Sequence, residues 1–155
     1  MNLIYQLDGD SDVMKYITPG ILRTFDKVND VYLPKILKSY IEDNAFGIFA
    51  AHLINSNEYI GWFQFEFDNE FEKSIEIGWR LKKQYWGSGY PTEVAKVLSN
   101  DGLDKGKTIV ARAMVENKAS VRVMEKAGLT FVKEFWGDYE PHSGSHDVLY
   151  ERHVS

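Results

Sequence analysis

The chain contains no cysteine among its 155 residues, which excludes disulfide bonds, thiolate nucleophiles and cysteine-ligated zinc sites. It also lacks an apolar run long enough to span a membrane, and a basic N-terminal region followed by a hydrophobic segment. Lysine and arginine are scattered and the formal net charge is −5, whereas nucleic-acid binding needs a concentrated basic face. We therefore expect a single cytoplasmic domain over residues 1–155, with neither a nucleic acid nor a membrane as partner.

The histidines do not have the spacing of a metal site. His142 and His146 are joined by a loop of small residues, and His153 follows with no acidic or thiol partner at metal-ligand spacing. We expect a surface loop in this region and no metal ion.

Hydrophobic periodicity predicts alternating helices and strands, and several short hairpins in the first half of the chain. The expected helices are Asp10–Ile17, a helix from the capping Thr24 to Tyr40 with a kink or break at Pro34, Tyr90–Leu103, and Lys118–Lys126 ended by Gly128. The expected strands are Phe46–Ile54, Tyr59–Phe67, Ser74–Leu81, Thr108–Val115, Leu129–Trp136 and Asp147–Arg152. This order predicts an α/β (mixed α+β) fold with a mixed sheet.

A glycine-containing turn, Gln84-Tyr85-Trp86-Gly87-Ser88-Gly89, separates the expected strand Ser74–Leu81 from the helix that starts at Tyr90. Such a turn presents backbone N–H groups at a helix N-terminus, and its glycines let the main chain approach an anion such as a pyrophosphate. It lacks the Lys-Ser/Thr pair of a nucleoside-triphosphate loop, and Thr92 replaces the third glycine of a dinucleotide fingerprint. The turn alone is explained equally well as purely structural.

Two further segments give the turn a context. Gly89-Tyr90-Pro91-Thr92-Glu93 follows it directly, and the run from Asn117 to Gly128 has the pattern Asn-x-x-Ser-x-Arg-x-x-Glu-x-x-Gly. In order and spacing these motifs resemble the GCN5-related N-acetyltransferase (GNAT) superfamily, in particular the branch of ribosomal-protein N-terminal (RimJ/RimL-like) acetyltransferases. The similarity extends from about Asp10 to Arg152.

The resemblance implies a mostly antiparallel central sheet with helices on both faces, which splays apart between the Glu76 strand and the Thr108 strand. The pantetheine arm of acetyl-CoA would lie in that gap. The residues that the resemblance assigns to the cofactor are Trp79, Arg80 and Leu81 (backbone, pantetheine and thioester carbonyl), Gln84, Gly87, Ser88, Gly89 and Tyr90 (pyrophosphate), Asn117 (pantetheine) and Arg122 (phosphates).

Direct acetyl transfer to a primary amine requires a proton acceptor but neither a metal nor a protein nucleophile. Glu76 is the first candidate for the general base, with Glu66 in reserve, although a solvated strand glutamate or a salt-bridge partner is an equal alternative for Glu76. Family members often carry a tyrosine acid at the position of Met124, so Ser120, on the same helical stripe, is the candidate acid. The alternative for Ser120 is a capping role in its own helix.

The acceptor is open between a protein N-terminal amine and a small amine such as a polyamine or an amino sugar. Because Met124 replaces the tyrosine, a non-catalytic acyl-CoA-binding sensor or assembly module is the alternative function. Family members usually begin with an extra strand, for which only residues 3–6 are available as a stub. Without that strand, an exposed sheet edge would invite a homodimer.

Overall fold

The computed structural model describes residues 2–18, 21–42, 45–136 and 146–154. The helical elements are α1 (Tyr5–Asp8), α2 (Ser11–Met14), α3 (Phe25–Lys27), η1 (Val28–Tyr32), α4 (Leu33–Glu42), η2 (Lys83–Tyr85), α5 (Tyr90–Asp104) and α6 (Lys118–Lys126). The strands are β1 (Gly47–His52), β2 (Tyr59–Phe67), β3 (Ser74–Leu81), β4 (Thr108–Met114), β5 (Thr130–Trp136) and β6 (His146–Arg152).

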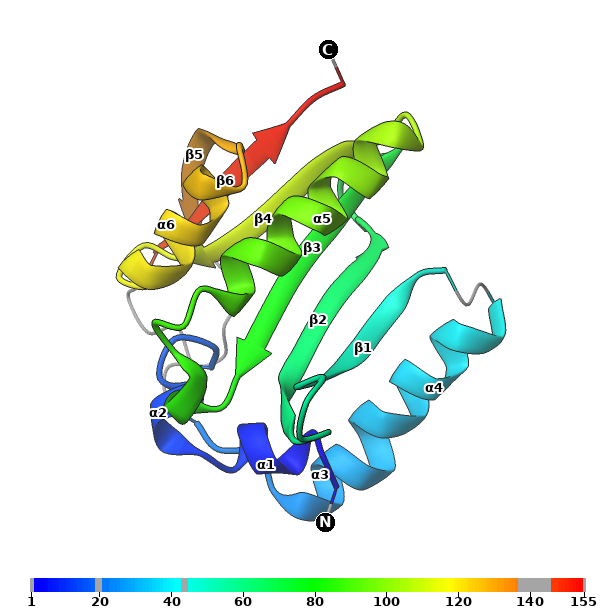
Figure 1. Cartoon of the computed structure of the whole chain (residues 1–155), viewed down its shortest axis with the longest axis vertical. Helices are drawn as coiled ribbons and strands as arrows, with labels where there is room; N and C mark the ends of the chain where they lie inside the picture. Colours follow the sequence, from blue (N-terminus) through cyan, green and yellow to red (C-terminus); the bar gives the residue numbers. More distant parts are fainter. Residues whose placement is uncertain (1, 19–20, 43–44, 137–145, 155) are drawn as a thin grey trace. The chain divides into compact units, whose positions relative to one another are not determined.

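The six strands form one sheet in the order β1-β2-β3-β4-β6-β5 (Figure 1). Strands β3 and β4 are parallel, whereas β1 with β2, β4 with β6 and β5 with β6 are antiparallel. The predicted mixed, mostly antiparallel sheet is confirmed. The chain divides into two compact units, the first made of Met1–Phe65 with Trp79–Ser88 and the second of Glu66–Gly78 with Gly89–Ser155.

The first unit begins with a helix where the family resemblance asks for a strand. Asn2 Oδ1 accepts the backbone N–H groups of Ile4 at 2.9 Å and Tyr5 at 3.4 Å, which caps the first turn. Helix α1 then buries Leu7 and Asp8 completely. The possible strand stub over residues 3–6 is therefore wrong, because capping and burial of this short segment favour a helical turn.

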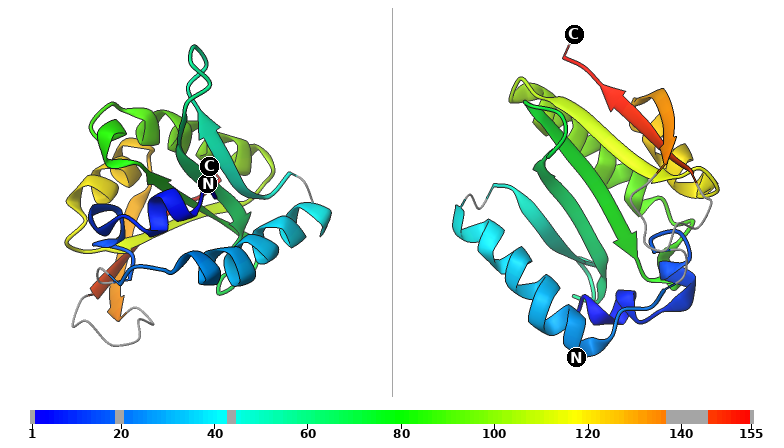
Figure 2. Two further views of the ribbon diagram at one scale, coloured as in Figure 1. Left: turned by 90° about the horizontal axis from the view of Figure 1, so that it is seen from below. Right: turned by 180° about the vertical axis from the view of Figure 1, so that it is seen from behind.

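The predicted helix from Thr24 to Tyr40 is continuous, with a wider π-helical turn instead of a break. Thr24 caps its start by accepting the N–H of Lys27, and Leu33 N–H donates to the carbonyl of Val28 in the π turn. Pro34 lacks an N–H and its ring would clash with the carbonyl four residues earlier, so the wider turn relieves that clash. Helix α4 then runs beside β1 (Figure 2).

Strands β1 and β2 form the predicted antiparallel hairpin, with Gly47 opposite Phe65 and His52 opposite Tyr59. Phe63 and Phe65 are buried as expected for one face of β2, whereas Phe67 is 50% exposed at the end of the strand. The predicted apolar face therefore ends before the last residue of β2.

Gly61 in β2 allows a close approach of the β3 backbone. A Cβ at this position would lie 2.1 Å from the carbonyl oxygen of Arg80, and φ of Gly61 is +152°. Because the neighbouring atom is main chain, Gly61→Ala is expected to lower the free energy of unfolding by about 3 kcal/mol or more in urea titrations. At Gly106, where φ is +71° and a Cβ would meet no atom within 4 Å, alanine is expected to cost only about 1 kcal/mol. Equal losses at the two glycines would contradict this explanation.

In the second unit, α5 and α6 pack against β4 and against each other (Figure 1). Gly102 permits the close packing of α5, since a Cβ there would lie 2.3 Å from Cδ1 of Ile109. Helix α6 has the predicted bounds, and Gly128, at φ +88°, follows its C-terminus as predicted.

The parallel pairing of β3 with β4 is short. It joins Ser74, Ile75 and Glu76 to Thr108, Ile109 and Val110, and within the described residues this register ends at Glu76. Strand β3 nevertheless continues through Ile77 and Gly78. These are the two strands between which the resemblance places the splay of the sheet.

Candidate functional site

The turn between β3 and α5 has the open conformation that the sequence predicts. Gly87 and Gly89 have φ of +76° and +85°, and a Cβ at either would meet no atom of the described residues within 4 Å. Glycine is therefore required at both positions because of the positive φ, and not because a side chain would clash. Trp86 supports the turn, because its Nε1 donates to the carbonyl of Leu81 at 2.9 Å.

Gly89 is the N-cap residue of α5, which extends over 15 residues. The first N–H groups of a helix have no intrahelical acceptor, and Gly89 has no side chain with which to cap them. Pro91 occupies the first turn, where a missing N–H costs nothing. The helix dipole also favours an anion at this end, so the turn is suited to a diphosphate.

The segment that leads into the turn is fixed within the first unit. Leu81 is buried, Lys83 Nζ forms an exposed ion pair with Asp12 at 2.7 Å, and Gln84 Nε2 donates to Glu58 Oε1 at 3.3 Å. The side chain of Gln84 is thus already hydrogen-bonded to Glu58. We therefore expect the main chain of this segment to bind an anion more strongly than the Gln84 side chain does.

The candidate residues of α6 have different environments. Asn117 is the N-cap, and its Oδ1 accepts the N–H of Ser120 at 3.2 Å. This cap is therefore made by the Asn117 side chain. Arg122 is exposed, whereas Met124 is completely buried, so its side chain contributes to the core of the second unit.

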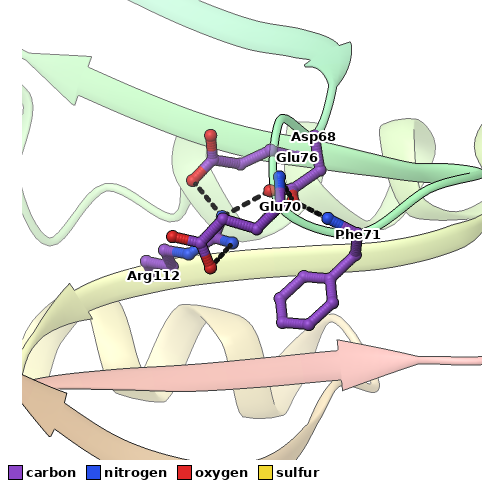
Figure 3. Close-up of polar contacts among 5 residues, drawn as sticks. All are labelled: Asp68, Glu70, Phe71, Glu76 and Arg112. Atoms are coloured by element: carbon purple, nitrogen blue, oxygen red, sulfur yellow. Dashed lines mark hydrogen bonds and ion pairs between the residues drawn. The ribbon is translucent and has the colours of Figure 1, made fainter.

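Arg112 on β4 holds a cluster of carboxylates that sequence reasoning did not identify (Figure 3). Its Nη1 donates to Asp68 at 2.5 Å and to Glu76 at 3.0 Å, and its Nη2 donates to Glu70 at 3.2 Å. Asp68 additionally accepts the N–H groups of Glu70 at 2.8 Å and Phe71 at 2.7 Å. The first-choice base, Glu76, is therefore engaged in an ion pair with an arginine 36 residues later in the chain.

The environment gives the carboxylates different acidities. Burial alone would raise the pKa of Asp68, but hydrogen bonds from Arg112 and from backbone N–H groups lower it below its usual value. Burial raises the pKa of Glu66, and the negative charge of Glu76 raises it further. Glu66, the reserve candidate, is thus the carboxylate adapted to take up a proton nearer to neutral pH.

Arg112→Met is expected to lower the free energy of unfolding by about 1 to 3 kcal/mol at neutral pH, because Asp68 is left buried without its charged donor. The pKa of Asp68 is lowered in the folded protein, so its contribution is present above the ordinary aspartate pKa and is lost as pH falls through the folded value. The deficit of Arg112→Met should therefore shrink between neutral pH and about pH 2 in denaturant titrations. Lys105→Met, which removes the exposed pair with Asp101, serves as the control, with an expected loss below about 0.5 kcal/mol. A deficit that does not depend on pH would contradict the assignment.

Within the described residues, no three histidine, aspartate or glutamate side chains are grouped so that they could hold a metal ion. His142 lies outside the described residues. His153 Nε2 is 2.9 Å from Glu151 Oε1, and His146 Nδ1 is 3.6 Å from Glu134 Oε2. A separate search of the described residues finds no helix with the length and hydropathy of a membrane span.

Comparison with known proteins identifies the family. The model of the acetyltransferase (GNAT) domain matches residues 1–130. The chain is 31% identical over 157 residues to the uncharacterized N-acetyltransferase YnaD of Bacillus subtilis, covering 88% of this chain and 82% of the relative.

Two solved structures show the same fold at low identity. The spermidine N-acetyltransferase of Vibrio cholerae in complex with CoA and spermine has a TM-score of 0.76 at 17% identity, covering 97% of this chain and 88% of that chain. RimL, a ribosomal L7/L12 alpha-N-protein acetyltransferase in complex with CoA, has a TM-score of 0.77 at 16% identity, covering 97% of this chain and 86% of that one. These comparisons confirm the predicted fold class, and the family match identifies the chain as an acyltransferase belonging to the GNAT acetyltransferase family.

Proposed function

We propose that this protein is an N-acetyltransferase that binds acetyl-CoA at the turn from Gln84 to Tyr90 and acetylates a primary amine by direct attack in a ternary complex. The observation that carries this proposal is the open turn, in which Gly87 and Gly89 have positive φ and leave free space in front of the N-terminus of α5. An anionic diphosphate would bind the backbone N–H groups there, with Ser88 beside the two glycines. Acetyl-CoA supplies the thioester-activated acetyl group.

The pantetheine arm would be bound by strand backbone. The register of β3 with β4 ends at Glu76, so the main chain that follows in β3 is the natural partner for an extended arm. We assign the backbone of Trp79, Arg80 and Leu81 to this role. Asn117 and the exposed Arg122 are assigned to the pantetheine and the phosphates, respectively, on the family motif.

Two glutamates would have different roles in removing the acceptor's proton. An alkyl ammonium group has a pKa of about 10.4, so a base is needed near neutral pH. Glu66 has a raised pKa, whereas Glu76 is ion-paired with Arg112. We therefore assign the base to Glu66 and give Glu76 the role of a fixed negative charge that raises the pKa of Glu66.

Protonation of the leaving thiolate would fall to Ser120 or to solvent. The buried Met124 has no proton to give, and Asn117 makes the helix cap, so the Ser120 hydroxyl is available for this role. A CoA thiolate is also a sufficiently stable leaving group without strong acid assistance, so Ser120→Ala is expected to reduce turnover less than loss of the base does.

The acceptor is a protein N-terminal amine or a small amine. The relatives with this fold include an enzyme acting on a ribosomal protein and one bound to spermine. We further propose that the protein works in the cytoplasm, and that it forms a homodimer through the edge strand β1.

The function is tested by incubating the protein with acetyl-CoA and a panel of N-terminal peptides, polyamines and amino sugars, with release of free CoA as the readout. We expect amine-dependent CoA release that is lost in Glu66→Gln. Binding of acetyl-CoA without turnover of any amine would instead support the non-catalytic acyl-CoA-binding module.

A further inference from the structure

A buried ion-pair network lies at the N-terminal end of the first unit. Asp8, at the end of α1, is fully buried, and its two carboxylate oxygens bind different arginines. Oδ1 accepts from Arg80 Nη1, and Oδ2 accepts from Arg23 Nη1 at 2.7 Å. The backbone carbonyl of Asp8 also accepts the N–H of Arg23 at 3.1 Å. Helix α1 therefore contacts β3 through an ion pair.

Arg80 is constrained at both its side chain and its main chain. Its side chain is 9% exposed, and its guanidinium lies 4.9 Å from the centroid of the Trp62 ring. Its carbonyl oxygen fills the space that a Cβ at Gly61 would need. One residue beyond Leu81, the N–H of Lys82 donates to the carbonyl of Ile60 at 2.9 Å. The ion pair with Asp8, the ring of Trp62 and the backbone of β2 therefore all restrict the position of Arg80.

Stability alone does not account well for this network. Burying an arginine is costly, and replacing a buried ion pair by apolar side chains of similar size is often neutral or stabilising. The buried Arg80 Nε also has no hydrogen-bond partner within the described residues, so part of the desolvation cost is not recovered. The ion pair does restrict the orientation of Arg80, because a guanidinium held by a carboxylate has few favourable geometries.

We propose that Asp8 is a positioning residue for acetyl-CoA: by holding the side chain of Arg80, it fixes the main chain of Trp79–Leu81 that binds the pantetheine arm. This inference rests on the proposed function. In this proposal Asp8 does not contact the cofactor. Its effect is transmitted through Arg80, whose side chain it holds.

Three variants separate positioning from simple stabilisation. Asp8→Asn leaves Arg80 buried without its charge partner and is expected to lower the thermal midpoint. The double variant Asp8→Asn with Arg80→Met removes the buried Asp8–Arg80 pair and is expected to recover part of the lost midpoint, because Arg23, the other partner of Asp8, is 20% exposed and keeps access to water. Asp101→Asn is the matched carboxylate control, because its pair with Lys105 is exposed and lies within α5.

The dissociation constant for CoA, measured by titration calorimetry, is the deciding quantity. We expect the folded double variant to bind CoA about tenfold more weakly than the wild type, with Asp101→Asn within about threefold of the wild type. A folded double variant with wild-type affinity would overturn the positioning role, even if Asp8→Asn alone does not fold.

A second readout does not depend on cofactor binding. In ¹H–¹⁵N spectra of the free protein, we expect the backbone amide signals of Trp79, Arg80 and Leu81 to move in Asp8→Asn and to stay near their wild-type positions in Asp101→Asn. Unmoved signals in folded Asp8→Asn would overturn the inference. Failure of the wild type to bind CoA, by contrast, would refute the proposed function and leave these amide shifts as an independent test of the positioning by Asp8.

Discussion

Replacement of Gly89 by valine is expected to weaken CoA binding by at least about a hundredfold while leaving the protein folded. A Cβ at Gly89 would meet no atom within 4 Å in the described part of the chain, so the branched side chain would project into the space that we assign to the diphosphate. A β-branched residue also resists the φ of +85°, so the turn would relax away from its open shape. The expected cost in unfolding free energy is about 1 to 3 kcal/mol, which most folded domains survive.

Gly106→Val provides the matched control for this variant. Gly106 has φ of +71° and equally free surroundings, but it lies between α5 and β4, outside the proposed cofactor turn. The two valines should therefore lower the unfolding free energy by similar amounts, and only the one at position 89 should impair CoA binding. Equal CoA affinity in the two variants would show that the turn does not bind the cofactor.

Glu66→Gln is expected to lower kcat by about 10² to 10³, the usual effect of losing a general base. In the wild type, the acidic limb of the pH profile should lie above 4.5, because burial and the charge of Glu76 raise the pKa of Glu66. The raised pKa means that ionised Glu66 destabilises the fold as pH rises through the folded value, so the amide variant should be at least as stable as the wild type at neutral pH. Steady-state pH profiles together with urea titrations test both expectations.

Glu76→Gln distinguishes the two candidate bases. If Glu76 is a fixed charge, its removal should shift the acidic limb toward the ordinary glutamate pKa and reduce kcat much less than Glu66→Gln does. The opposite result would be a large loss of kcat in Glu76→Gln and a nearly unchanged kcat in Glu66→Gln. It would show that Glu76 is the base.

The elements that sequence analysis placed well are those with a strong local pattern. Strands β2 and β3 have their predicted bounds because alternating apolar residues give a period of two over eight or nine positions. Helix α6 is bounded by the capping Asn117 and by Gly128, both of which act within a few residues. The glycine turn was predicted because its requirement for positive φ is also local.

What the sequence did not predict depends on long-range contacts or on very short elements. Helix α1 contains four residues, too few for a helical period to be recognised. Arg112 and Glu76 are separated by 36 positions, and Asp8 and Arg80 by 72, so neither pairing leaves a local signal. The choice between Glu66 and Glu76 depended on their burial and on their charged partners. Periodicity places each glutamate on a strand face but gives neither its burial nor its partners.

The most direct test is a crystal structure of the protein grown with CoA. We expect the diphosphate to lie at hydrogen-bonding distance, about 3 Å, from backbone N–H groups between Gly87 and Tyr90. We also expect the pantetheine to run along the main chain of Trp79–Leu81. Well-defined density for CoA at any other place, with the glycine turn empty, would contradict the central claim.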